Sequence, residues 1–294
     1  MTRLGAGVYP AAVTPFDERG AIDVPGVARL LAWFASKGCN GAVLAGTNGE
    51  GPSLSAPEKR DLVRVAVPLA DGFGLQIVLG IASNSLEETV WLCRQAYEAG
   101  CPAVLLMPPG YFREAPEAAI EAWFMQVLNR SPIGVLVYNF PKRTGITLTA
   151  ELMQRLARHE RMLGLKDSSG SRENVASYAE ALRGLGKLLY VGDETLLSAT
   201  LNAGWTGTIS GAANVLPLWL SEIVSSWHTD PDAAQTKFEL VLPAIEALRS
   251  VSQPAANKLL LREFGVLERN SVRLPLLPMD QVPESLEVVR RLAS

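Results

Sequence analysis

The chain contains 294 residues, of which 48% are hydrophobic and 19% are charged, so it has enough apolar material for a large core and no compositional sign of disorder. Its formal net charge of -3 argues against nucleic acid or an anionic membrane surface as the main partner. This length is common for one large α/β barrel, although it would also accommodate two ordinary domains.

Short apolar runs alternate with amphipathic stretches along most of the chain. Runs that are apolar throughout are typical of strands buried on both faces, and the stretches between them have helical periodicity. Eight strand–helix units predict a (β/α)8 TIM barrel rather than an open doubly wound sheet, and no GxGxxG follows the first strand. We expect the strands at 7–14, 41–46, 75–81, 103–109, 133–139, 162–167, 188–193 and 207–212.

After residue 215 the strand pattern stops. The stretches 216–227, 232–250 and 254–266 read as helices with no strand between them. The first is a candidate for the eighth barrel helix, and the others predict a C-terminal helical extension. We therefore divide one domain into a barrel with the active site at 1–225 and a helical extension at 226–294.

Lys166 and Asp167 stand at the end of one expected strand. In such a barrel, catalytic residues project from the C-terminal ends of the strands. An ammonium at the mouth of an apolar barrel is partly desolvated, which disfavours its charged form and leaves an amine that attacks carbonyl carbon. The product would be a Schiff base. Taken alone, Lys166 fits equally well a lysine that extends to solvent or pairs with Asp167.

Neighbouring strand ends supply groups that such chemistry needs. Tyr138 ends the preceding strand, and a phenol close to an amine can transfer protons. Thr47 could bond a phenol and relay its proton, and "GTNGEG" at 46–51 offers consecutive backbone N–H groups for a carboxylate. The alternatives are a core tyrosine with a bonded hydroxyl and a plain glycine-rich turn.

Five ordered motifs together resemble a known family. The chain is similar to the dihydrodipicolinate synthase / N-acetylneuraminate lyase family, which are class I, Schiff-base-forming pyruvate aldolases on a (β/α)8 barrel. The resemblance covers about residues 7–265. It rests on "GTNGEGPSL" (46–54), "PPGYF" (108–112), "YNFPKRTG" (138–145), "GLKDSSG" (164–170) and "VGDE" (191–194).

The resemblance implies a role for each matching residue. Lys166 would form the imine with pyruvate, and Tyr138 would position the substrate and pass the proton. Thr47 would connect Tyr138 to Tyr111, a tyrosine that in the family reaches into a neighbouring subunit, which implies a homo-oligomer, either dimer or tetramer. The remaining matches bind substrate: the backbone of Thr47 and Asn48 would hold the carboxylate of pyruvate, Ile209 would face the lysine, and Gly192 would contact the second substrate.

Arg143 bears on the second substrate. It matches an arginine that binds the carboxylate of the aldehyde in the synthase branch, which favours an acidic partner such as aspartate semialdehyde. Asn48 instead resembles the loop of 4-hydroxy-2-oxoglutarate aldolases. Because Asp193 and Glu194 could bind a polyol, a 2-keto-3-deoxy sugar-acid lyase or dehydratase stays as an alternative. Both carboxylates also suit the start of the next helix.

Two functions of other classes are weighed against this one. A non-catalytic barrel that binds a keto acid would not need both a nucleophile and a proton relay. A metal-dependent aldolase is disfavoured because the expected barrel mouth contains no histidine. We expect no metal and no cofactor. The N-terminus has no signal-peptide pattern and the few cysteines read as buried thiols, so we expect a cytoplasmic protein.

Overall fold

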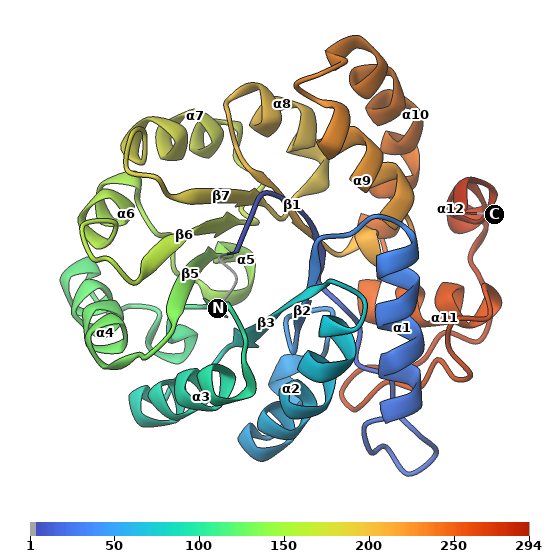
Figure 1. Cartoon of the computed structure of the whole chain (residues 1–294), viewed down its shortest axis with the longest axis horizontal. Coiled ribbons are helices and arrows are strands. Elements are labelled where there is room, and N and C mark those ends of the chain that lie inside the picture. The colour runs from blue at the N-terminus through green and yellow to red at the C-terminus, as the bar shows by residue number, and fades with distance from the viewer. Residues whose placement is uncertain (1–3, 294) are drawn as a thin grey trace.

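Eight parallel strands form a ring at the centre of the computed structural model, which describes residues 4–293 (Figure 1). They are hydrogen-bonded in the order β1-β8-β7-β6-β5-β4-β3-β2. Between β1 and β2 the ring is closed by hydrogen bonds from Ala12 N to Val43 O and from Asn40 N to Val8 O, both 2.9 Å. The strands are β1 (Gly7–Pro10), β2 (Gly41–Leu44), β3 (Gln76–Ile81), β4 (Ala103–Leu106), β5 (Gly134–Asn139), β6 (Met162–Asp167), β7 (Leu188–Val191) and β8 (Gly207–Ser210).

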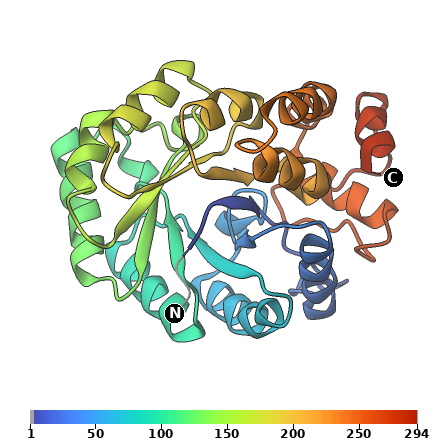
Figure 2. The same ribbon diagram turned by 45° about the horizontal axis from the view of Figure 1, so that its top comes forward.

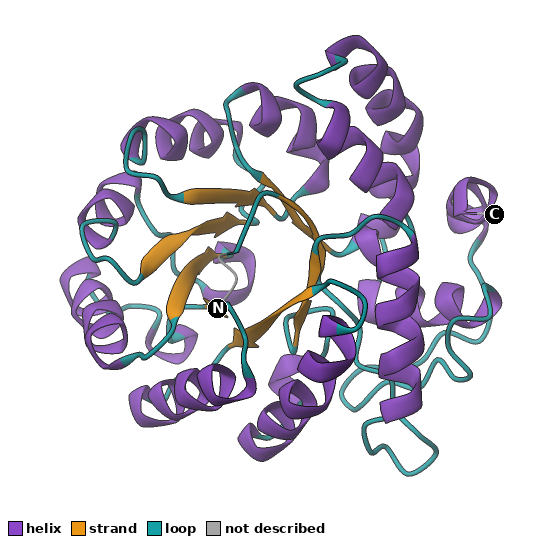
Figure 3. Ribbon diagram, in the orientation of Figure 1, coloured by secondary structure: helices purple, strands orange, loops and turns teal. Residues whose placement is uncertain are grey.

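Helices surround the strands on the outside, as Figure 3 shows in purple around orange, so the predicted (β/α)8 barrel is confirmed. Serine side chains begin several helices: Ser85 accepts a hydrogen bond from Glu88 N, and Gly100 ends the same helix with a φ of 94°. The helices of the ring are α1 (Val24–Ser36), α2 (Ala56–Asp71), α3 (Leu86–Ala99), α4 (Glu117–Arg130), α6 (Ala150–Leu156), α7 (Arg172–Ala181), α8 (Leu197–Asn202) and α9 (Pro217–Ser226). The four-residue α5 (Pro141–Thr144) follows β5 and appears inside the ring of strands in Figure 1.

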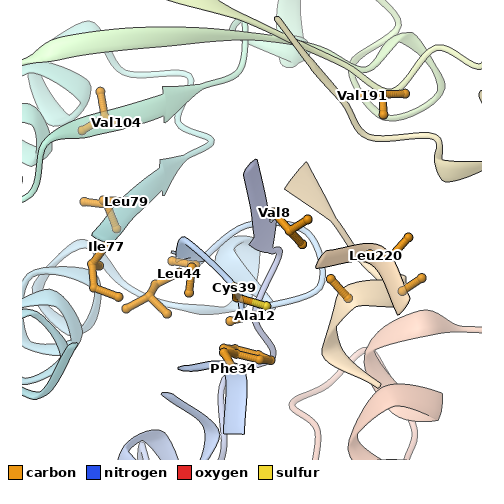
Figure 4. Close-up of a cluster of buried hydrophobic side chains, with 14 of the residues drawn as sticks. Val8, Ala12, Phe34, Cys39, Leu44, Ile77, Leu79, Val104, Val191 and Leu220 are labelled. Carbon is orange, nitrogen blue, oxygen red and sulfur yellow. The ribbon is translucent and has the colours of Figure 1, made fainter. Parts of the chain in front are cut away.

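The core has two layers because successive strand residues point to opposite faces. On β1, Tyr9 points into the barrel, where it packs with Val43, Ile209 and other inward residues. Val8 points outward and belongs to the larger layer between strands and helices, part of which is drawn in Figure 4. Apolar side chains fill both layers, so the strand ends are where polar groups can lie close together.

Several strands end earlier than the sequence predicted. The runs expected at 7–14 and 103–109 contain strands only at Gly7–Pro10 and Ala103–Leu106, whereas the run at 162–167 matches β6. The apolar residues beyond the strands continue as loops buried at the barrel mouth. Periodicity cannot separate a buried strand from a buried loop that follows it.

The C-terminal extension is helical, as predicted, and consists of α10 (Pro231–Arg249), α11 (Gln253–Glu263) and α12 (Glu287–Ala293). It packs beside α1 and α9 on one flank of the barrel (Figure 2). After α11, residues 268–277 return across the mouth; we call them the strap. Arg273 of the strap donates hydrogen bonds to the carbonyls of Gly20 and Ser53 at 2.7 and 3.0 Å. Within residues 4–293 no helix is both long and apolar enough to cross a membrane.

Candidate active site

A cavity of about 690 Å³ opens at the C-terminal ends of the barrel strands. Its wall comes from the loops that follow β2, β4 and β5, from the ends of β6 to β8, and from α11 and the strap. Seven of the residues proposed from sequence line it: Thr47, Asn48, Tyr111, Tyr138, Arg143, Lys166 and Gly192. This volume is in the usual range for a small-molecule site.

Lys166 and Tyr138 lie side by side at the base of this cavity. They are register partners on β6 and β5, and they are only 5% and 4% exposed. The ammonium Nζ lies 4.2 Å from the centroid of the tyrosine ring, a cation–π contact. In the described part of the chain Lys166 forms no salt bridge. The side chain therefore neither extends into solvent nor pairs with Asp167, which were the alternatives left open by the sequence.

Asp167 is turned away from the lysine into a buried hydrogen-bond network. Its carboxylate accepts hydrogen bonds from Asn139 Nδ2 and Ser169 Oγ, both at 2.7 Å. Burial raises the pKa of Asp167, and these hydrogen bonds act in the opposite direction. Asn139 also donates to the hydroxyl of Tyr178 at 3.1 Å. The network holds the ends of β5 and β6 together, at the strand positions that directly follow Tyr138 and Lys166.

Ser168 belongs to the site, although the sequence analysis did not assign it a role. Its Oγ donates a hydrogen bond to the hydroxyl of Tyr138 at 3.2 Å, and the residue is 6% exposed. A Cβ at Gly192 would lie 2.0 Å from Ser168 Oγ and 2.6 Å from Lys166 Cε. The bare backbone of Gly192 therefore leaves the space that both side chains occupy. The only sequence signal was the position of Ser168 two residues after the lysine.

Thr47 and Tyr111 are less tightly placed. Both line the cavity, but no hydrogen bond within residues 4–293 joins Thr47 to either tyrosine, and Tyr138 is bonded to Ser168 instead. Tyr111 lies on the 3₁₀ turn η2 (Gly110–Phe112) and is 76% exposed, with its backbone N–H donating to Asn84 Oδ1 at 3.0 Å. The three-residue relay is thus not assembled within one chain.

The other proposed substrate residues differ in their surroundings. Arg143 is exposed on α5 at the rim of the cavity. Ile209 is 1% exposed and packs inside the barrel below the cavity. Asn48 is 7% exposed and its side chain turns toward α11. Of these three residues, Arg143 is the one with a charged group at the rim of the cavity.

The two carboxylates after β7 are already paired. Arg249 at the end of α10 donates to Asp193 Oδ2 at 2.5 Å and to Glu194 Oε2 at 3.1 Å. Glu194 Oε1 accepts a further hydrogen bond from Ser210 Oγ at 2.6 Å. Asp193 also accepts from Thr195 N at the start of the next helical turn, as one sequence alternative expected. Both carboxylates are therefore committed to protein donors.

These features define a (β/α)8-barrel enzyme with a buried lysine and tyrosine at the C-terminal mouth. The chain belongs to the dihydrodipicolinate synthetase family, whose model matches residues 5–292. This confirms the resemblance found from the motifs and the expectation of a lyase-type enzyme.

Relatives agree along nearly the whole chain. The 4-hydroxy-tetrahydrodipicolinate synthase of Methanothrix thermoacetophila is 32% identical over 280 residues, covering 95% of this chain and 93% of that protein. The enzyme of the same name from Archaeoglobus fulgidus is 33% identical over 278 residues, covering 94% and 93%. Among solved structures, a dihydrodipicolinate synthase of Bacillus anthracis superposes with a TM-score of 0.90 at 26% identity, covering 99% and 98%.

Proposed function

We propose that this enzyme forms and cleaves carbon–carbon bonds through an imine between Lys166 and a 2-keto acid such as pyruvate. The observation that carries the proposal is the buried ammonium of Lys166 at the base of the cavity, in contact with the ring of Tyr138. A lysine held away from water and from carboxylates is suited to attack on a carbonyl carbon.

The steps follow from this contact. After losing its proton, Nζ adds to the keto carbon, and the carbinolamine loses water to give an iminium ion. The iminium withdraws electrons, so the neighbouring carbon loses a proton and becomes an enamine that attacks an aldehyde. Cleavage is the reverse. Tyr138 carries the proton in each direction, and the hydrogen bond from Ser168 Oγ orients its hydroxyl.

The second substrate in this proposal carries an acidic group. Arg143 at the cavity rim supports it, because a guanidinium binds a carboxylate through two parallel hydrogen bonds. Aspartate semialdehyde and a 4-hydroxy-2-oxoglutarate-type keto acid both qualify, and the names of the relatives favour the first. The sugar-acid alternative is weaker because Asp193 and Glu194 are already paired with Arg249.

The decisive experiment traps the imine. The protein is incubated with pyruvate, reduced with borohydride and weighed intact by mass spectrometry. We expect wild type to gain one reduced pyruvate and Lys166→Ala to gain none. Lys142→Ala, which removes an exposed lysine of α5, is the matched control and should still gain the adduct. No adduct on wild type, with pyruvate or with larger 2-keto acids, would contradict the proposal and favour a non-catalytic barrel.

We also propose that the chain works as a homo-oligomer, a dimer or a tetramer. Tyr111 and Phe112 are 76% and 66% exposed beside the cavity, and their rings contact each other edge-on. A second subunit over this pair would bury it and would bring Tyr111 toward a neighbouring cavity. Sedimentation equilibrium tests this: a wild-type monomer at all concentrations would contradict it, and Tyr111→Ala should weaken association.

Two further proposals concern the organisation of the chain. We propose that residues 226–294 form one domain with the barrel at 1–225, supported by the packing of α11 and the strap against the mouth. We propose a cytoplasmic location, supported by the free and buried state of Cys39, Cys93 and Cys101. Limited proteolysis that releases a stable barrel fragment would contradict the first.

A further inference from the structure

Three amide side chains form a hydrogen-bonded chain that leads from a buried position to the cavity wall. Asn257 on α11 is fully buried, while Asn48 after β2 and Gln253 at the start of α11 line the cavity. Asn257 Nδ2 donates to the carbonyl oxygen of Gly211 at 3.0 Å and to Asn48 Oδ1 at 3.3 Å. Asn48 Nδ2 in turn donates to Gln253 Oε1 at 3.3 Å. We call these three residues the amide chain.

The direction of the amide chain is fixed at its buried end. A backbone carbonyl can only accept, so Asn257 must turn its Nδ2 toward Gly211 and its other N–H toward Asn48. Asn48 then has its oxygen toward Asn257 and its nitrogen toward Gln253. By the same pairing, Gln253 has its oxygen toward Asn48. The end of the amide chain at the cavity is therefore a donor, Gln253 Nε2.

In the described part of the chain, residues 4–293, this donor has no acceptor. Within residues 4–293, Gln253 makes its one side-chain hydrogen bond through Oε1. A Cβ at Gly211 would lie 2.4 Å from Gln253 Oε1 and 2.7 Å from Asn48 Nδ2, so glycine is required for the amide chain to pass. Polar groups that line a binding cavity commonly form their hydrogen bonds with the ligand. We therefore expect Nε2 to donate a hydrogen bond to an oxygen of the bound molecule.

The charges nearby favour an anionic oxygen. The carboxylate in this wall, Glu50, is paired with the ammonium of Lys258, so it does not repel an anion. Asn48 directly follows Thr47 in the loop whose backbone N–H groups we expect to receive a carboxylate. A carboxylate in this loop would therefore lie beside the amide chain, where a neutral donor selects an acceptor without adding charge.

We infer that Gln253 Nε2 donates a hydrogen bond to the carboxylate of the 2-keto acid that forms the imine on Lys166. The inference rests on the proposed function, which it deepens by assigning a substrate-binding residue from the C-terminal extension. Gln253 is thus a specificity-determining residue: it favours binding of a keto acid and disfavours a ligand that presents N–H groups at the same place. Asn257 is a positioning residue, because it acts through Asn48.

The experiment compares pyruvate with pyruvamide, in which an amide replaces the carboxylate. For each variant, the keto compound is titrated and the half-saturating concentration is read from the borohydride-trapped adduct by intact mass. The variants are Gln253→Leu, which removes the donor, and Gln253→Glu, which replaces it with an anionic acceptor. Ser252→Ala is the matched control, since Ser252 also lines the cavity and its side chain makes no capping hydrogen bond.

Gln253→Leu should raise the half-saturating concentration of pyruvate by about tenfold or more, the effect of losing a hydrogen bond to a charged group. Gln253→Glu should raise it further for pyruvate but much less for pyruvamide, whose N–H can donate to the new carboxylate. The ratio of the two ligands within one variant does not depend on the fraction of folded protein. Ser252→Ala should keep the wild-type values for both ligands.

The outcomes separate the two proposals. If wild type traps pyruvate but both Gln253 variants half-saturate like Ser252→Ala, the role of Gln253 is wrong and the imine on Lys166 stands. If wild type traps neither compound, the proposed function fails and this inference fails with it. A Gln253→Glu variant with an unchanged pyruvate-to-pyruvamide ratio would also overturn the inference.

Discussion

Lys258 of α11 and Glu50 of the loop after β2 form an ion pair in which both side chains are fully buried. Glu50 also accepts a hydrogen bond from the backbone N–H of Arg273 at 2.7 Å, and Lys258 donates to the carbonyl of Ser271 at 2.7 Å. The loop that carries Thr47 is therefore bound to both α11 and the strap. The C-terminal extension is part of the site rather than an appendage.

Removing one partner of this pair should be far worse than removing both. Lys258→Met leaves the Glu50 carboxylate buried and unpaired, and we expect the free energy of unfolding to fall by about 3–5 kcal/mol. The double variant Glu50→Gln, Lys258→Met has no buried charge and should recover most of this loss. Urea unfolding of the three proteins measures it. Equal stability of the single and double variants would contradict the prediction.

The same pair predicts a pH dependence of stability. Burial lowers the pKa of Lys258 from 10.5 to about 8, although the Glu50 carboxylate acts in the opposite direction. Between these values the unfolded chain holds a proton that the folded protein has released. The contribution of Lys258 to the free energy of unfolding should therefore rise with pH across this window and stay constant below it.

The measurement is urea unfolding of wild type and of the double variant at several pH values. The two proteins share all other titrating groups, so the difference between their free energies of unfolding isolates the contribution of the pair. A difference that stays flat or falls between about pH 8 and about pH 10.5 would show that Lys258 keeps its proton in the folded state.

Ser168 should matter for proton transfer but not for imine formation. In Ser168→Ala the hydroxyl of Tyr138 loses its hydrogen-bond donor, while Lys166 keeps its place. We expect the exchange of the pyruvate methyl protons with deuterated water, followed by NMR, to slow by about 100-fold. The borohydride-trapped adduct should still form. Methyl exchange at the wild-type rate would show that Tyr138 does not need this serine.

Gly192→Ala should disrupt the site through its shape. The new Cβ would lie 2.0 Å from Ser168 Oγ and 2.6 Å from Lys166 Cε, so both side chains must move. We expect the adduct to be lost, with a fall in stability of about 1–3 kcal/mol. Gly72→Ala, whose Cβ would come no closer than 3.4 Å to Leu69 O, is the matched control and should trap pyruvate normally. A normal adduct on Gly192→Ala would contradict the prediction.

The barrel and the residues at its strand ends could be predicted from sequence because their signals are local. An apolar run that ends in a charge, as at Lys166, predicts both a strand and the point where it ends. Both predicted ends of β6 match the structure. Glycines after amphipathic stretches marked helix ends in the same way, as at Gly100. The alternation of such runs is sufficient for the fold class.

The partners of the site could not be predicted because their contacts are distant in sequence. Arg249 pairs with Asp193 across 56 positions, and Gln253 meets Asn48 across 205. Nothing in the pattern of α10 or α11 marks these residues as different from other helix-end residues. Ser168 lies only two positions after Lys166, but its role depends on the hydrogen bond to the hydroxyl of Tyr138, which the sequence does not show.

The order of these residues along the chain determines when the cavity wall is completed during synthesis. Gln253, Lys258 and Arg273 are translated after every barrel strand, yet Gln253 lines the cavity, and Lys258 and Arg273 hold the loop after β2 through Glu50. A nascent chain leaves the ribosome with its N-terminal part first. Lys166, Tyr138 and Ser168 therefore leave the ribosome before Gln253, and the cavity wall is complete only after α11 has been synthesised.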